Sequence, residues 1–348
     1  MKKNILFLIT KSEIGGAQRF VQEQVALLAE QGYPVFLVTN QPGWLSAHTG
    51  CKKVGFHSGI ESKASIAFLW FLCRFIRLHK IDLLVCNSAN GGLYGRLAAA
   101  LMFTKAVYVS HGWSSVYNGG KLAPLFNFVE KVLANISAGV LCISENDYEV
   151  GLHKIGIQAK KLTLMPNAIY PLKNLSPKLD SSILKVLMVC RLDHPKKPDL
   201  LVKAVKELGY PIQLTLVGDG PMMPALVQLL GPTTINVELK GEINGFKDFA
   251  AYDVFALISA SEGLPISALE AMSAGLALLL SNVGGCPSLI AENGVLVTNE
   301  VESIKQGILA VKDNLQAFKA ASKKRFDDYH NLSINAPKYI SYYNSKAK

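Results

Sequence analysis

Short apolar segments alternate with helix-forming segments along most of the chain, and this alternation constrains the fold more than any other feature. In the first half, strands are predicted at Ile5–Thr10, Val35–Thr39, Leu83–Cys86, Val107–Ser110 and Val140–Ile143. Helices are predicted between them at Ala17–Glu30, Ser65–Leu78, Gly91–Met102 and Leu122–Ile136. Such apolar runs are typical of parallel strands buried on both faces, and consecutive βαβ units predict a doubly wound α/β sheet.

The alternation breaks once and then restarts. The break lies at Pro166-Asn167 and continues from Pro171 to Ser182, a stretch rich in Pro, Ser, Asn and Lys. Beyond it, strands are predicted at 186–190, 214–217, 237–240, 254–258 and 277–280, with helices near 198–208, 222–230, 266–274 and 301–312. We therefore predict two Rossmann-like domains, at 1–168 and 169–332, in this chain of 348 residues.

The bulk composition indicates a protein of the reduced cytoplasm. No apolar run reaches the roughly 18–20 residues that span a bilayer. The first ten residues resemble a signal peptide, but their apolar part, Ile5–Ile9, is short and no small-residue cleavage site follows, so we predict a buried strand. The six cysteines are scattered without a C-x-x-C pair, which argues against a zinc site or a disulfide framework.

Positive charge is concentrated in the first half of the chain. Residues 1–170 hold 17 Lys and Arg against 9 Asp and Glu, a net +8, whereas residues 171–348 hold 19 against 17. This excess indicates an anionic partner such as a lipid headgroup, a lipid-linked pyrophosphate or nucleic acid, or simply a basic surface. No nucleic-acid-binding motif accompanies the charge, so we expect no nucleic-acid partner.

The segment from Ser261 to Gly285 combines two carboxylates with a helix start. Glu262 and Glu270 lie eight residues apart, and the loop Gly263-Leu264-Pro265 leads into a helix that begins near Ile266. A helix N-terminus offers unpaired amides and a positive dipole end, which bind phosphates, while carboxylates accept hydrogen bonds from hydroxyls. The alternative is an ordinary amphipathic helix with two surface glutamates.

Two cations follow the first predicted strand of the second domain. Arg191 and Lys197 lie six residues apart across a proline-containing loop, an arrangement suited to a diphosphate. Glycine turns follow other strands, at Gly15-Gly16 and at Gly218, and glycine lets backbone approach a ligand closely. His111 follows a strand at its carboxyl end, where doubly wound folds bind ligands, although a structural histidine is the alternative.

These segments together resemble the retaining glycosyltransferases of family 4, also called glycosyl transferases group 1, which share the two-domain GT-B fold. The spacing of Glu262 and Glu270 resembles the E-x7-E signature of that family. The resemblance implies that Glu262 lies beside the transferred sugar and that Glu270 binds the ribose hydroxyls. It also implies that Arg191 and Lys197 bind the donor diphosphate.

The resemblance extends to further positions. It implies that His111 contacts the donor sugar, that Gly15 and Gly16 line the cleft, and that Gly218 shapes the nucleotide side. The remaining residues implied in donor binding are Gly241, Ile243, Gly263, Leu264, Pro265 and Ile266. The last helix of the resembled fold crosses back onto the first domain, which we expect of residues 333–348.

Two segments depart from the family pattern. Pro198 stands where the family has glycine, and Lys196 adds a cation, so Lys196 is an alternative to Lys197 as the phosphate ligand. Cys286-Pro287-Ser288 replaces the Ile-Pro-Glu of many relatives, so the role of that glutamate is absent or moved.

The resemblance implies a retaining transferase that moves a sugar from a nucleotide-sugar, with UDP preferred, to a lipid-linked or oligosaccharide acceptor. Relatives of this size build bacterial lipopolysaccharide, capsule or exopolysaccharide. Because the sequence has no D-x-D, we expect neither a metal nor another cofactor. A cytoplasmic protein, peripheral on the anionic inner face of the membrane, would fit the basic first half. The alternatives are an epimerase-like enzyme of the same fold and a catalytically silent nucleotide-sugar-binding subunit.

Overall fold

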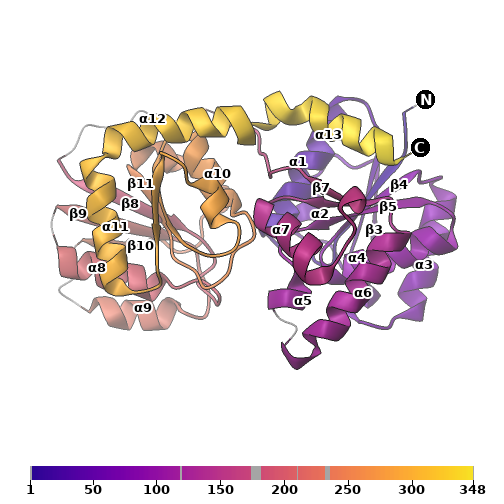
Figure 1. Cartoon of the computed structure of the whole chain (residues 1–348), viewed down its shortest axis with the longest axis horizontal. Helices are drawn as coiled ribbons and strands as arrows, with labels where there is room; N and C mark the ends of the chain where they lie inside the picture. Colours follow the sequence, from indigo (N-terminus) through magenta and orange to yellow (C-terminus); the bar gives the residue numbers. More distant parts are fainter. Residues whose placement is uncertain (1, 118–119, 174–181, 210, 232–235, 348) are drawn as a thin grey trace. The chain divides into compact units, whose positions relative to one another are not determined.

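The computed structural model describes residues 2–117, 120–173, 182–209, 211–231 and 236–347. The chain divides into two compact units (Figure 1). The first contains Met1–Asn167 and Asn335–Lys348, and the second contains Ala168–Ile334. Each unit is a parallel α/β fold.

Within the described residues, the first unit is built on a seven-stranded parallel sheet in the order β3-β2-β1-β4-β5-β6-β7. The strands are β1 (Ile5–Leu8), β2 (Val35–Thr39), β3 (Lys53–Phe56), β4 (Leu83–Asn87), β5 (Lys105–Ser110), β6 (Gly139–Cys142) and β7 (Leu162–Leu164). The chain reverses its direction of travel across the sheet between β1 and β4, which defines the topological switch point of this unit.

The longer helices of the first unit cover the two faces of this sheet. Helix α1 (Gly16–Glu30) connects β1 to β2. Helices α3 (Ile66–Leu78), α4 (Ala89–Leu101) and α6 (Ala123–Ile136) follow connections that run the other way. Right-handed crossovers therefore put α3, α4 and α6 together on the opposite face, where α4 contacts both of its neighbours. Short helices α2 (Trp44–Ala47), α5 (Ser114–Tyr117) and α7 (Glu145–Glu149) complete the unit.

The core of the first unit lies between the sheet and these helices. Strands β1, β2, β4 and β6 are buried along their whole length, as expected for parallel strands covered on both faces. Helix α3 begins at its cap Ser65, whose hydroxyl accepts a hydrogen bond from the Phe68 amide at 3.2 Å. Phe68, Leu72 and Phe75 are buried on its inner side. The predicted helix Ser65–Leu78 therefore covers the sheet with one face.

The C-terminal helix α13 (Leu332–Lys346) belongs to the first unit over most of its length. The Tyr343 hydroxyl donates to Gln24 Oε1 at 3.0 Å, and the Tyr339 hydroxyl donates to the Pro166 carbonyl at 3.1 Å. Both tyrosines are fully buried. The tyrosine-rich end of the sequence is thus part of the core of the first unit.

The described part of the second unit contains a six-stranded parallel sheet in the order β10-β9-β8-β11-β12-β13. Its strands are β8 (Leu184–Val189), β9 (Ile212–Val217), β10 (Val237–Leu239), β11 (Val254–Leu257), β12 (Ala277–Ser281) and β13 (Gly294–Val297). Its helices are α8 (Pro198–Leu208), α9 (Met223–Leu230), α10 (Ile266–Ser273), α11 (Val301–Asp313) and α12 (Leu315–Arg325). The switch point lies between the adjacent strands β8 and β11.

The predicted doubly wound fold is confirmed in both units, whereas several elements were not predicted. Strands β3, β7 and β13 were missed, and all three lie at the edges of their sheets. Edge strands carry polar or glycine residues, as in Lys53–Phe56, so they lack the continuous apolar signal of central strands. Helix α12 was also missed. Among the residues that the structure describes, no helix is both long and apolar enough to cross a bilayer.

Candidate active site

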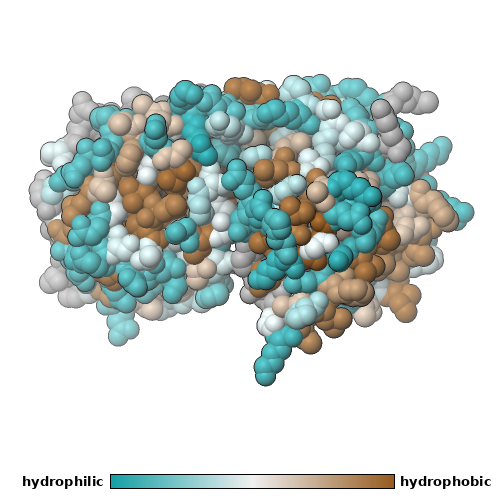
Figure 2. All heavy atoms as spheres, viewed as in Figure 1, coloured by the Kyte–Doolittle hydropathy of each residue, from teal (hydrophilic) through white to brown (hydrophobic). Residues whose placement is uncertain are grey.

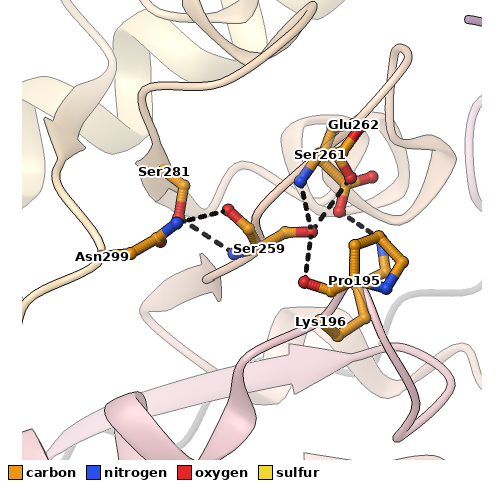
Figure 3. A network of polar contacts seen from close by, with 7 residues as sticks. All are labelled: Pro195, Lys196, Ser259, Ser261, Glu262, Ser281 and Asn299. Carbon is orange, nitrogen blue, oxygen red and sulfur yellow. Dashed lines mark hydrogen bonds and ion pairs between the residues drawn. The ribbon is translucent and has the colours of Figure 1, made fainter. Parts of the chain in front are cut away.

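Two loops at the carboxyl edge of the second sheet bring Lys196 and Glu262 together. Lys196 follows β8 and Glu262 follows β11, the neighbouring strand. The ammonium of Lys196 forms an ion pair with Oε1 of Glu262 (Figure 3). The Glu262 side chain is 7% exposed and that of Lys196 is 20% exposed, so the pair is largely shielded from water. It lies at the switch point, where doubly wound folds bind ligands.

The loop that carries Lys196 is bonded to the end of β11. Lys196 and Ser259 form an isolated antiparallel β-bridge. The Ser259 hydroxyl lies 3.2 Å from the Pro195 carbonyl oxygen and 3.0 Å from that of Ser261, and its hydrogen can bond to either. Figure 3 shows this hydroxyl between the two loops. The bridge fixes Lys196 opposite Glu262 through the backbone.

A ring of hydrogen bonds holds Ser259 to the ends of two further strands. The Ser259 amide donates to the Ser281 hydroxyl at 3.0 Å, and that hydroxyl donates to Asn299 Oδ1 at 2.7 Å. Asn299 Nδ2 then donates to the Ser259 carbonyl at 2.9 Å. Because β11, β12 and β13 are linked in this way, the position of Glu262, three residues beyond Ser259, is preorganised.

The turn after β12 packs directly against the backbone of Glu262. Gly284 has a φ of +52°, and a Cβ built on it would overlap the Glu262 carbonyl oxygen. The next amide, that of Gly285, lies 3.3 Å from this oxygen and 3.0 Å from the Gly263 carbonyl oxygen. Only glycine meets both the backbone conformation and the close approach required at position 284.

Helix α10 begins directly after this loop. Pro265 is its N-cap, no side chain caps the helix, and its first turn contains no acidic residue. Amides at such an end are available to an anionic ligand. Glu270 is half-buried and lies one turn inside the helix. The Gly263–Ile266 segment therefore has the local structure that the sequence predicted.

The two adjacent lysines after β8 have different surroundings. Lys196 is engaged with Glu262, whereas Lys197 is the N-cap of α8 and its amide donates to the Ile258 carbonyl at 2.9 Å. The Lys197 ammonium has no ion-pair partner within 4.0 Å among the described residues. Arg191 is exposed, and its Nε lies 4.0 Å from an Asp193 carboxylate oxygen. Lys196 is thus paired with a largely buried carboxylate, whereas Arg191 contacts only a partly exposed one.

Glycines bring the neighbouring loops of this unit close together. A Cβ on Gly218 would overlap the Cys190 carbonyl oxygen, because the backbone segments after β8 and β9 approach each other closely there. The Gly218 amide donates to the Gly241 carbonyl at 2.8 Å, and Gly241 has a φ of +68°. Ile243, two residues further on, is exposed. The loops after β8, β9 and β10 therefore form one continuous edge beside the lysines.

The switch point of the first unit carries Gly15 and Gly16. Gly15 is the N-cap of α1, and Gly16 is the first residue of that helix. The loops after β1 and β4 are bonded to each other, since the Thr10 amide donates to the Ser88 hydroxyl at 3.1 Å and the two hydroxyls lie 2.6 Å apart. The start of α1 is thereby held at the carboxyl edge of the first sheet.

His111 lies at the same edge of the first sheet, after β5. Its Nε2 is 2.8 Å from Oδ1 of the buried Asn87, whose Nδ2 donates to the Val85 carbonyl at 3.2 Å. Since Asn87 Oδ1 can only accept, Nε2 carries the proton and Nδ1 is left as an acceptor. Burial lowers the pKa of His111 to about 4, so the ring is neutral at physiological pH. Such a ring can accept a hydrogen bond from a hydroxyl.

Asp147 lies behind the His111 loop and was missed by the sequence analysis. Its carbonyl accepts a hydrogen bond from Trp113 Nε1 at 2.7 Å, and its amide donates to the Ser144 hydroxyl at 3.1 Å. Burial raises the pKa of the Asp147 carboxyl to about 6, although polar groups of Ser144, Gly112 and Ser110 oppose the shift. No sequence pattern marked Asp147, whereas Asn87 ends the strand beside β5 and was detectable from that position.

The residues given roles in the sequence analysis fall into two groups. Gly15, Gly16 and His111 lie at the carboxyl edge of the first sheet, and the others lie at the carboxyl edge of the second. In the described parts of the chain, no group of three or more His, Cys, Asp and Glu side chains is placed to hold a metal ion.

Two family models match the chain, one in each half. Residues 14–171 match the model described as Glycosyltransferase Family 4. Residues 184–314 match the model described as Glycosyl transferases group 1. Together they span every strand of the two sheets except β1.

Similar proteins include the O-antigen biosynthesis glycosyltransferase WbnH of Escherichia coli. The two are 38% identical over 335 residues, covering 94% of this chain and 97% of WbnH. A second E. coli relative, UDP-Gal:alpha-D-GlcNAc-diphosphoundecaprenol alpha-1,3-galactosyltransferase, is 24% identical over 342 residues, 86% of each chain. The solved structure of Anabaena HepE in complex with UDP matches with a TM-score of 0.81 at 18% identity, covering 99% of this chain and 100% of that one. This likeness confirms the predicted GT-B fold class.

Proposed function

Since this chain is a member of glycosyltransferase family 4, we propose that it moves a sugar from a UDP-sugar to a lipid-linked or oligosaccharide acceptor, with retention of anomeric configuration. The proposed product is part of an O-antigen or a related bacterial surface polysaccharide. The similarity to WbnH supports the polysaccharide class, and the HepE complex with UDP supports the nucleotide.

The observation that carries the proposal is the preorganised pair Lys196–Glu262 at the switch point of the second unit. Lys196 is paired with Oε1 of Glu262, so Oε2 can accept a hydrogen bond from a sugar hydroxyl. The uncapped start of α10 follows within four residues. A carboxylate for the sugar and amides for the phosphates thus stand next to each other along the chain.

In the proposed reaction, the bond between the anomeric carbon and the diphosphate oxygen breaks, and its electron pair leaves with UDP. An acceptor hydroxyl forms the new bond on the same face of the sugar, and its proton passes to a phosphate oxygen of UDP. Arg191, Lys197 and the start of α10 stabilise the charge that grows on the diphosphate. We propose that these groups take the place of a metal ion.

The remaining residues orient the two substrates in this proposal. Glu270 accepts hydrogen bonds from the ribose hydroxyls, and backbone groups at Gly241 and Ile243 hold the uracil. The neutral His111 ring accepts a hydrogen bond from the donor sugar through Nδ1. The first unit, which carries most of the net positive charge, binds the acceptor at the inner face of the cytoplasmic membrane.

A donor screen tests the proposed function. Purified protein is given UDP-, GDP- and ADP-sugars in the presence of EDTA, with and without a bacterial lipid extract, and release of nucleoside diphosphate is recorded. We expect release from a UDP-sugar that persists in EDTA, grows with the lipid and is lost in Glu262→Gln. The exposed Glu292→Gln serves as the matched control and should leave turnover unchanged.

Other outcomes would contradict the proposal. Turnover that does not depend on any acceptor would favour an epimerase-like or hydrolytic enzyme. Donor binding without turnover, across a wide set of lipid-linked and oligosaccharide acceptors, would favour a silent binding subunit.

A further inference from the structure

Helix α6 presents its apolar stripe outward, away from the sheet that it covers. Its exposed apolar side chains recur at helical spacing and form one stripe: Leu125, Phe128, Val129, Val132 and Ile136. On the inner side of the same helix, Glu130 forms an ion pair of 2.8 Å with Arg96, which is fully buried on α4. In this helix a carboxylate points inward and apolar side chains point outward. Such an exposed apolar surface indicates a binding surface for an apolar partner or a membrane.

The exposed apolar surface continues onto the two neighbouring helices. Phe103, two residues after the end of α4, is 97% exposed and has a φ of +53°, which is rare for a bulky residue. Leu101 on α4 and Ile66 and Trp70 on α3 are also exposed. Helix α4 contacts both α3 and α6, so these side chains belong to one layer, here called the α3–α4–α6 face. Figure 2 shows brown side chains gathered over this part of the first unit.

The segment that contains α3, α4 and α6 is also strongly basic. Between Ser65 and Ser137 the sequence holds seven Lys and Arg but only two Asp and Glu, a net charge of +5. One of those acids, Glu130, is already paired with Arg96. Six of these cations are exposed, and Arg74, Arg77 and Lys131 lie on α3 and α6 themselves; the other three are Lys80, Lys105 and Lys121. Arg74 lies over the exposed ring of Trp70, 5.6 Å from its centroid.

We infer that the α3–α4–α6 face docks on an anionic lipid bilayer, with the outer stripe of α6 and the ring of Phe103 inserted at the headgroup boundary. The apolar side chains enter the acyl region, and the long Lys and Arg side chains reach the phosphates from its border. This inference rests on the proposed function for the presence of a membrane-bound acceptor, and it adds which surface makes the contact.

Charge separates a bilayer from the other possible occupants of this face. A second copy of the chain, paired through the same face, would place one +5 segment against another. A nucleic acid would satisfy the cations but would leave Phe103, Phe128 and Trp70 against a polar backbone. Anionic lipids provide both the negative headgroups and the apolar interior that these residues require.

Vesicle binding of the full chain tests the inference. The protein is sedimented with vesicles of phosphatidylethanolamine and phosphatidylglycerol, or with phosphatidylcholine vesicles. In parallel, the tryptophan fluorescence of the protein is recorded. We expect binding to the anionic vesicles alone, with a blue shift that is absent in Trp70→Phe. The double variant Leu125→Asp/Phe128→Asp should lower the partition coefficient by at least about tenfold. Val227→Asp, an exposed apolar position on α9, is the matched control and should bind normally.

The charge contribution is tested separately. Lys121→Glu/Lys131→Glu should weaken binding and reduce its salt dependence, whereas Lys312→Glu on α11 should not. Equal binding by the wild type and by both double variants would overturn the inference. Self-association of the wild type without lipid, lost in Leu125→Asp/Phe128→Asp, would overturn it in favour of a second copy.

These results are independent of catalysis. Glu262→Gln should bind vesicles as the wild type does, even though it is expected to be inactive. Conversely, Leu125→Asp/Phe128→Asp should keep its turnover of a UDP-sugar with a water-soluble acceptor. If neither the wild type nor any variant bound vesicles while turnover remained normal, the docking inference would be wrong and the proposed function would stand.

Discussion

Breaking the pair between Lys196 and Glu262 by Lys196→Met should both destabilise the second unit and lower kcat/KM for the donor. Removing one partner of a buried ion pair leaves an uncompensated charge, which costs about 3–5 kcal/mol when the site is fully buried. Lys196 keeps 20% of its side chain exposed and Glu262 keeps 7%, so water screens part of this cost. We therefore expect Lys196→Met to lower the free energy of unfolding by about 2 kcal/mol.

A double-mutant cycle measures the pair itself. Lys196→Met, Glu262→Gln and their combination are unfolded in urea, and the double variant should recover most of the stability lost by Lys196→Met. We expect a coupling energy of about 2 kcal/mol, because the neutral amide no longer needs the ammonium. The matched control is the cycle Lys324→Met with Asp328→Asn, an exposed pair of the same unit, which should show little or no coupling because water screens it.

The same variants connect stability to chemistry. If Lys196 holds Glu262 ready for the sugar, Lys196→Met should reduce kcat/KM for the donor even at temperatures where the protein is fully folded. A coupling energy equal to that of the control pair would refute the reasoning. So would wild-type turnover in Lys196→Met, because Glu262 would then not depend on its partner.

Three further predictions concern other parts of the site. Burial raises the pKa of Asp147 to about 6, so the carboxyl stabilises the fold while protonated and this contribution is lost as pH rises through that value. Asp147→Asn should therefore raise the thermal midpoint at about pH 8 but not at about pH 4, and an equal shift at both would contradict this. Gly284→Ala should lower the free energy of unfolding in urea by more than about 2 kcal/mol. The control Gly245→Ala, at a position with a positive φ but open space around it, should lower it by about 1 kcal/mol. Similar losses in both variants would show that close packing at Gly284 does not matter. Lys197→Ala should weaken UDP binding by about tenfold or more in calorimetry, and unchanged affinity would remove Lys197 from the proposed phosphate site.

The sequence allowed the fold to be predicted because central parallel strands are continuous apolar runs. The same property explains what was missed, since edge strands such as Lys53–Phe56 have no such run. Helical periodicity also located the helix at Leu122–Ile136. It could not show that the apolar stripe of this helix faces outward, because periodicity identifies a stripe but not what lies against it.

The site could be predicted only in part. Sequence spacing identified Glu262, Glu270, Arg191 and Lys197 as candidates. It could not show which of the two adjacent lysines pairs with Glu262. That choice depends on the backbone of the Pro195 loop and on its bridge to Ser259. Asp147 could not be predicted because its raised pKa results from burial behind the His111 loop, and this burial exists only once the chain has folded.

The position of α13 has a consequence for the order in which the protein is made. Tyr339 and Tyr343 complete the core of the first unit, and the ring of Tyr343 packs edge-on against Phe7 of the first strand at 6.3 Å. After Asn167 leaves the ribosome, about 170 further residues must be added before Asn335 appears, which takes roughly 10–30 s. During that interval the nascent first unit lacks the two tyrosines that cover part of its core. The half that is synthesised first is therefore the half that is finished last.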